Sequence, residues 1–174
     1  MKTVVIYQSQ TGFTKQYAEC IAEKTQADII CFKEAKNKDF SSYDTIAFGS
    51  WCCAGGLQKL KWFKERMSQW NDKKLVVFAV GASPVENPDV ETSLHNMFTD
   101  EEREIVKAFY CPGGLRYDKM TASSRLLMKM FAKALQSKKN KTDEEMHTAN
   151  MLGKSYDISD QKYIEPIVEF IIGK

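Results

Sequence analysis

Apolar and polar positions divide the chain into short strand-like runs that alternate with helix-like stretches. Five apolar runs, enriched in β-branched and aromatic residues, predict buried strands over 3–7, 27–32, 44–49, 74–80 and 105–111. Apolar residues at helical spacing predict helices from about residue 14, and over 57–70, 90–98, 123–135 and 159–172. This alternation implies βαβ crossovers, and therefore a parallel sheet that is covered by helices on both faces.

Capping signals mark where some helices begin. Thr99 with Glu102, and a second pair at 142–145, have the spacing of capping boxes. Ser159 is predicted to cap the last helix, in which Pro166 is expected to introduce a bend.

Length and composition fit one domain. The chain has 174 residues, of which 43% are apolar, and this suffices for a substantial core. We find no internal repeat and no linker long enough to divide the chain, so residues 1–174 are predicted to form a single domain. The formal net charge of only +2 gives no reason to expect nucleic-acid binding.

Cysteine usage and the absence of targeting signals predict a cytoplasmic protein. The five cysteines are an odd number without CxxC spacing, which is typical of reduced thiols. No apolar run approaches the roughly 18 residues of a membrane span, and no signal peptide precedes the first strand. With only two histidines, a structural zinc site is not expected.

In a doubly wound sheet, ligands bind outside the carboxyl ends of the strands. The loops at those ends are predicted to be 8–14, 50–56, 81–88 and 111–117. The first of them is rich in hydroxyl side chains and stands directly before a helix. Backbone N–H groups, the helix dipole and the hydroxyls favour a phosphate site, although Ser and Thr side chains that only cap the helix are the alternative.

Three kinds of phosphate chemistry do not fit this loop. The GxxxxGK[ST] motif of a P-loop is not present. The GxGxxG motif of a dinucleotide site is also missing, because Gly12 is the single glycine of this loop. A phospho-receiver site needs acidic residues after the first strand and an aspartate at the end of the third. The chain has Gln8, Ser9, Gln10 and Ser50 at those positions, which leaves a mononucleotide as the ligand.

The segment VIYQSQTGFT resembles the phosphate loop of flavodoxins. The resemblance implies a three-layer α/β sandwich with a five-stranded parallel sheet in the order 2-1-3-4-5, and helices on both faces. It also implies that FMN is the cofactor and that one loop holds its phosphate, through Ser9, Gln10, Thr11, Gly12, Phe13 and Thr14. Phe13 replaces the commoner asparagine and removes one hydrogen-bond donor.

By the same resemblance, the loops after the third and fourth strands clamp the isoalloxazine ring. The implied residues are Ser50, Trp51, Cys52, Ala54, Gly55, Gly81, Ala82 and Ser83. Trp51 either stacks on the ring or is a core or rim tryptophan. Gly55 or Gly56 would let a backbone carbonyl turn towards the flavin N5. Cys52 and Cys53 are interpreted as incidental small residues rather than a redox pair, because adjacent cysteines form a disulfide only with strain.

The segment FYCPGGLRYDKM and the helix that follows resemble one sub-branch of flavodoxin-domain proteins, which includes the menaquinone-dependent protoporphyrinogen oxidases. The resemblance adds Gly114 and Arg116 to the cofactor-binding residues. Two departures separate the chain from that branch. Ser124 stands where the branch often has an acidic residue, and the 50–56 loop carries a double cysteine and a double glycine.

The segment 119–141 contains seven basic residues and no acidic one. Leu127, Met130, Phe131, Ala134 and Leu135 recur at helical spacing within it. We expect an ordinary surface helix whose apolar stripe packs on the sheet. The alternative is a basic amphipathic helix that binds an anionic membrane peripherally or docks an acidic redox partner.

The sequence thus predicts an FMN-binding electron-transfer protein with a redox partner protein or a quinone as its partner. The first alternative is a flavin-dependent oxidoreductase that acts on a quinone or on protoporphyrinogen. The second is a flavodoxin fold that has lost FMN and serves as an interaction module. The sequence predicts no catalytic acid–base pair and leaves the oligomeric state open.

Overall fold

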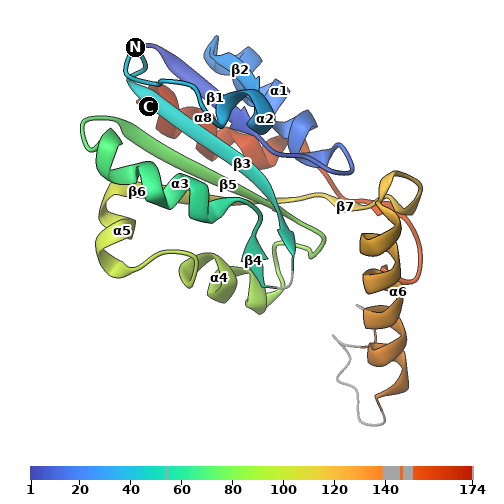
Figure 1. The fold of residues 1–174 in the computed structure, drawn as a ribbon. Helices are drawn as coiled ribbons and strands as arrows, with labels where there is room; N and C mark the ends of the chain where they lie inside the picture. Colours follow the sequence, from blue (N-terminus) through green and yellow to red (C-terminus); the bar gives the residue numbers. More distant parts are fainter. Residues whose placement is uncertain (54, 139–145, 147–150, 174) are drawn as a thin grey trace.

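The apolar runs of the sequence pair into one parallel sheet at the centre of the computed structural model (Figure 1), which describes residues 1–53, 55–138, 146 and 151–173. Its parallel strands are β1 (Thr3–Tyr7), β2 (Asp28–Cys31), β3 (Thr45–Cys53), β5 (Lys74–Gly81) and β6 (Val106–Pro112). Their spatial order is β2-β1-β3-β5-β6, and each neighbouring pair is parallel. Numbered over the parallel strands alone, this is the predicted order 2-1-3-4-5.

The third predicted strand is longer than expected and turns back on itself. β3 continues to Cys53, and the short strand β4 (Gly56–Leu57) pairs with it antiparallel, Cys53 opposite Gly56. Gly55 has a φ of +77°, which suits the tight turn between them. Much of the predicted 50–56 loop is therefore a β-hairpin.

Helices connect and follow the strands in the described residues. They are α1 (Phe13–Thr25), α2 (Phe32–Ala35), α3 (Leu60–Met67), α4 (Pro88–His95), α5 (Asp100–Ile105), α6 (Ala122–Ser137) and α8 (Glu165–Ile172), with the 3-10 helices η1 (Ser68–Trp70), η2 (Tyr117–Lys119) and η3 (Gln161–Ile164). A separate antiparallel ribbon joins β7 (Gly114–Leu115) to β8 (Tyr156–Asp157).

The pleat of the strands divides the core into two layers. Val76 and Phe78 of β5 belong to the layer that contains α1 and α8, whereas Val77 belongs to the layer that contains α3 and η1. Tyr17 of α1 and Ile167 of α8 are buried in the first layer. Both faces of the sheet are covered, as the near-continuous apolar strands predicted.

The predicted helix boundaries hold in part. The Thr99–Glu102 capping box is confirmed, with Thr99 Oγ1 accepting from Glu102 N (3.2 Å) and Glu102 Oε2 accepting from Thr99 N (2.9 Å). The prediction for Ser159 was wrong, because Asp160 caps η3. Pro166 lies in the first turn of α8, where its missing N–H removes no helical hydrogen bond. The pair at 142–145 lies outside the described residues.

α6 does not pack on the sheet as expected. It stands beside the carboxyl end of the sheet and extends away from it (Figure 1), and its buried residue Ala132 packs in a small cluster with Leu115 and Leu152. Within the part of the chain that the structure describes, no helix combines the length and the apolar character needed to span a bilayer.

Candidate functional site

The loop between β1 and α1 brings a backbone turn and hydroxyl groups to the start of a 13-residue helix. Gly12 is the N-cap residue of α1, and its φ of +102° is rarely adopted by residues with a side chain. Its N–H donates to Ser9 Oγ (3.1 Å). In the described residues no side chain caps α1, so the interpretation that Ser and Thr serve only as caps was wrong. The helix start presents its N–H groups and its positive dipole end at the loop.

Arg116 brings a positive charge to this otherwise neutral loop. Its guanidinium carbon lies 3.9 Å from the ring centroid of Phe13, and Nη1 donates to the Thr11 carbonyl oxygen (3.3 Å). Nη2 forms an ion pair with Asp157 (2.9 Å). Burial pushes the pKa of Asp157 upwards, but hydrogen bonds from Ser159 and Arg116 outweigh it and hold this pKa below its ordinary value.

A partly open cavity of about 100 Å³ lies next to the loop at the carboxyl edge of the sheet. Its lining combines residues from the ends of four strands with one face of α6, namely Gln10, Thr11, Phe13, Thr14, Trp51, Cys52, Cys53, Val80, Gly81, Ala82, Gly114, Leu115, Met120, Ser124, Leu127 and Met128. Most of these side chains are apolar, and Trp51 contributes an aromatic surface. Such a lining suits a flat, largely apolar group with few polar atoms.

The structure brings most of the predicted binding residues to this cavity. Nine of them line it, namely Gln10, Thr11, Phe13, Thr14, Trp51, Cys52, Gly81, Ala82 and Gly114. Ser9 and Gly12 line a neighbouring recess on the outer side of the first loop, together with Lys15 and Lys33. Sequence reasoning missed both lysines, although Lys15 directly follows the predicted phosphate loop.

Other predicted residues lie around the cavity without lining it. Ser83 and Gly55 follow the strand ends, and Arg116 contacts the first loop. Ser50 is fully buried, and its Oγ has no hydrogen-bond partner among the described residues. Ala54 lies outside the described residues.

The two adjacent cysteines do not form a redox pair. Both are free thiols, and adjacent residues of an extended strand such as β3 point to opposite faces of the sheet. Burial raises the pKa of Cys52 to about 12, so its thiol stays protonated at neutral pH. The interpretation as incidental small residues is consistent with this environment.

Two partly buried tyrosines hold the loop after β5. Tyr110 Oη donates to the Ser83 carbonyl oxygen and Tyr156 Oη donates to that of Ala82, both at 2.7 Å. A Cβ on Gly81 would lie 2.4 Å from Tyr110 Oη, so only glycine allows this approach. Tyr156 comes from β8, far along the chain, and carries no local sequence signal for this role.

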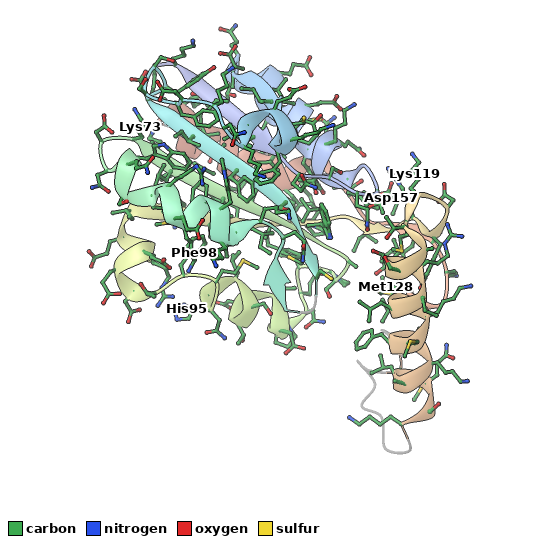
Figure 2. The ribbon with its side chains drawn as sticks, in the orientation of Figure 1. Lys73, His95, Phe98, Lys119, Met128 and Asp157 are labelled. Atoms are coloured by element: carbon green, nitrogen blue, oxygen red, sulfur yellow. The ribbon has the colours of Figure 1, made fainter. Side chains whose placement is uncertain are left out.

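α6 forms the opposite wall and is tied to the first loop. Gln10 Nε2 lies within hydrogen-bond distance of Ser124 Oγ (3.2 Å) and Thr121 Oγ1 (3.4 Å) at the start of the helix. Figure 2 shows Met128 on the side of α6 that faces the sheet, where it lines the cavity together with Leu127. None of these helix residues is among the predicted cofactor-binding residues.

No cluster of His, Cys, Asp and Glu that suits a metal ion occurs among the residues that the structure describes.

Comparison with known proteins gives the following matches. A family model described as Flavodoxin domain matches residues 4–143. Matching solved structures include a flavodoxin from the domain Archaea, at 18% identity and a TM-score of 0.44, which covers 88% of this chain and 94% of that one. A flavoprotein from Lactobacillus acidophilus NCFM in complex with FMN matches at 17% identity and a TM-score of 0.47, covering 64% and 91%. Oxidised Flavodoxin 2 from Bacillus cereus matches at 18% and 0.42, covering 63% and 84%. No curated protein matches the chain.

Proposed function

The chain belongs to the flavodoxin domain family, and from its site we propose that it binds FMN non-covalently and transfers electrons. One observation carries the proposal. Gln10 and Thr11 of the first loop, and Phe13 and Thr14 in the first turn of α1, also line the apolar cavity. A phosphate at the helix start and a flat ring in the cavity would therefore occupy one continuous site.

The residues present fit this cofactor. The backbone at Gly12 turns where a side chain would be strained, and an added Cβ would approach Arg116 Nη1 to 3.1 Å. Backbone N–H groups of the loop, the Ser9 and Thr11 hydroxyls and Arg116 are suited to hold the phosphate. Trp51 offers a stacking surface for the ring. A bound flavin supplies the redox chemistry, while the protein anchors, orients and tunes it.

Flavin titration tests the cofactor. We expect FMN to bind the purified protein at least about 100-fold more tightly than riboflavin. Riboflavin lacks the phosphate, so two or more charge-assisted hydrogen bonds are lost. Quenching of flavin fluorescence measures both affinities. FAD serves as the comparison for a larger phosphate group. A protein that quenches none of the three flavins would contradict the proposal and would favour the interaction-module alternative.

Electron transfer needs a separate measurement. The FMN-loaded protein is reduced with dithionite under anaerobic conditions, freed from excess reductant and mixed with ferric cytochrome c. We expect stoichiometric reduction of the cytochrome by the protein-bound flavin. Failure to reduce cytochrome c, despite tight FMN binding, would separate the cofactor proposal from the electron-transfer proposal.

An oxidoreductase that acts on a quinone is the second candidate, and the α6 wall favours it. Leu115, Leu127 and Met128 give the cavity an aliphatic side that suits a flat apolar acceptor. A saturable rate with a naphthoquinone, well above the rate with cytochrome c, would support this candidate. Protoporphyrinogen is tested as reductant in the same assay, although neither the family model nor the structures described above name that oxidase branch.

A further inference from the structure

α6 exposes an apolar strip that neither the core nor the cavity explains. Leu126, Leu127, Met130 and Phe131 are 60%, 54%, 61% and 53% exposed. Leu127 lines the cavity, but the other three do not. We call Leu126, Met130 and Phe131 the outer strip of α6. A cofactor in the cavity would leave this strip in water.

The contact between α6 and the rest of the molecule uses a different side of the helix. Met128, Ala132 and Leu135 pack with Leu115 and Leu152 in a small cluster. The inner contact is therefore already made, and the outer strip is a second apolar surface on the same helix.

Positive charge flanks the outer strip. Lys129 and Lys133 are exposed and stand three positions after Leu126 and Met130, so each lysine neighbours a strip residue on the helix surface. They line an open recess with two further basic residues, Arg125 and Lys154, and the acidic Asp118. None of the four basic side chains forms an ion pair within the described part of the chain. Apolar residues beside such a cluster of cations match a surface that is both apolar and anionic.

We infer that the outer strip of α6 binds reversibly to an anionic phospholipid bilayer, with Leu126, Met130 and Phe131 in the interface and Lys129 and Lys133 on the headgroups. A helix with an apolar strip beside a row of lysines lies in the plane of a bilayer. Lipid chains accept the apolar side chains without a complementary shape, and the lysine side chains extend to the headgroups. A second copy is a poorer occupant, since pairing through the strip would bring two basic flanks together. The inference stands apart from the proposed function, because it uses no residue of the cavity.

Binding of the outer strip to a bilayer would also bring the cavity close to the lipid. Leu127 stands between the strip residues Leu126 and Phe131 and the cavity that it lines. The α6 side of the cavity would therefore lie next to the lipid surface. A lipid-borne apolar molecule would reach the cavity without crossing water.

Vesicle cosedimentation tests the inference. We expect binding to vesicles of equal parts phosphatidylglycerol and phosphatidylcholine at low salt, weak binding to pure phosphatidylcholine, and loss of binding in high salt. Lys129→Glu/Lys133→Glu is expected to lower the partition coefficient at least about tenfold, because each cation near an anionic surface contributes about fivefold. Leu126→Ser/Met130→Ser/Phe131→Ser should lower it similarly while leaving FMN binding and the circular dichroism spectrum unchanged.

A matched control separates a specific surface from general charge. Lys38→Glu/Lys107→Glu makes the same change in net charge at exposed positions outside α6 and should retain binding. Equal loss in this control, or no binding of the original protein to anionic vesicles, would overturn the inference. So would a dimer in sedimentation velocity that the strip variant dissolves, since a second copy would then occupy the strip. Because FMN binding is measured on the same samples, failure of the membrane proposal is distinguishable from failure of the cofactor proposal.

Discussion

The two walls of the cavity are built in different ways. The sheet wall continues the strands: Trp51 is still paired with Val80 across β3 and β5, and Tyr110 and Tyr156 hold the carbonyl groups of the next loop. The α6 wall consists of aliphatic and thioether side chains on a helix that reaches the first loop through hydrogen bonds of Gln10.

This difference indicates how binding energy is divided. Positions in the sheet wall are fixed by neighbouring strands and partly buried hydrogen bonds, so substitutions there are poorly absorbed by small shifts. Met128 in the α6 wall has an unbranched, adaptable side chain. We therefore expect the sheet wall to determine whether a flavin binds, and the α6 wall to affect mainly what reaches it. The following predictions test that division, from the largest expected effect to the smallest.

Alkaline pH should destabilise the folded protein through ionisable groups of the central sheet. Burial raises the pKa of Cys52 and Cys111 to about 12 and also raises that of Tyr110. The unfolded chain releases these protons earlier, near the ordinary thiol pKa of 9.0. Stability is therefore complete below pH 9 and falls as pH rises towards 12, by about 1.4 kcal/mol per pH unit for each thiol. Urea unfolding of the flavin-free protein between pH 8 and 11 measures this slope.

A single substitution checks the cause of that slope. Cys52→Ala should make it shallower by about 1.4 kcal/mol per pH unit, since one fewer buried proton is then released on unfolding. Cys111→Ala should do the same. If both variants keep the original slope, the thiols do not cause the alkaline loss.

Gly12→Val should impair the phosphate loop. The positive φ of Gly12 disfavours a β-branched residue, and the new Cβ would press on Arg116. Strain of about 1–3 kcal/mol corresponds to FMN affinity about 5- to 150-fold lower. Gly173→Val is the control, because Gly173 has a φ of +77° in open space at the end of α8. This control should lose some stability but bind FMN normally.

Trp51→Ala should lower FMN affinity about tenfold, because aromatic stacking contributes about 1 kcal/mol beyond buried area. Trp51→Phe keeps an aromatic face and should recover most of the loss. The alternative role of Trp51 as a core residue predicts a different outcome, in which the alanine variant loses stability in urea and its FMN affinity is unchanged.

Met128→Ala should change FMN affinity by about twofold or less, because the α6 wall adapts to a smaller side chain. Isothermal titration calorimetry of this variant and of Trp51→Ala gives the comparison directly. A larger loss for Met128→Ala than for Trp51→Ala would reverse the proposed division between the walls.

Local sequence signals predicted the sheet and its loops well. β-branched runs identify strands because strand periodicity and burial are encoded within a few consecutive residues. The Thr99–Glu102 box was predictable for the same reason, since both partners lie within one helical turn.

The α6 wall was not predictable in this way. Periodicity located the helix. Its apolar residues cover an arc wide enough for two surfaces, and their spacing does not show which surface packs against the rest of the protein. Met128 turns inward and Met130 outward, although both are apolar and two residues apart. The contact of Tyr156 with Ala82 joins residues 74 positions apart. Long-range placements of this kind depend on tertiary packing, which single-sequence patterns do not contain.

The β7–β8 ribbon has a consequence for how this molecule tolerates change. Gly114 pairs with Asp157 and Leu115 with Tyr156, so the chain leaves and returns at adjacent points. When a segment connects two such points, a change in its length alters the entropy cost of loop closure only slightly. The segment 116–155 can therefore vary in length while the sheet keeps its register. The ribbon therefore lets the α6 wall of the cavity change while the sheet wall stays the same.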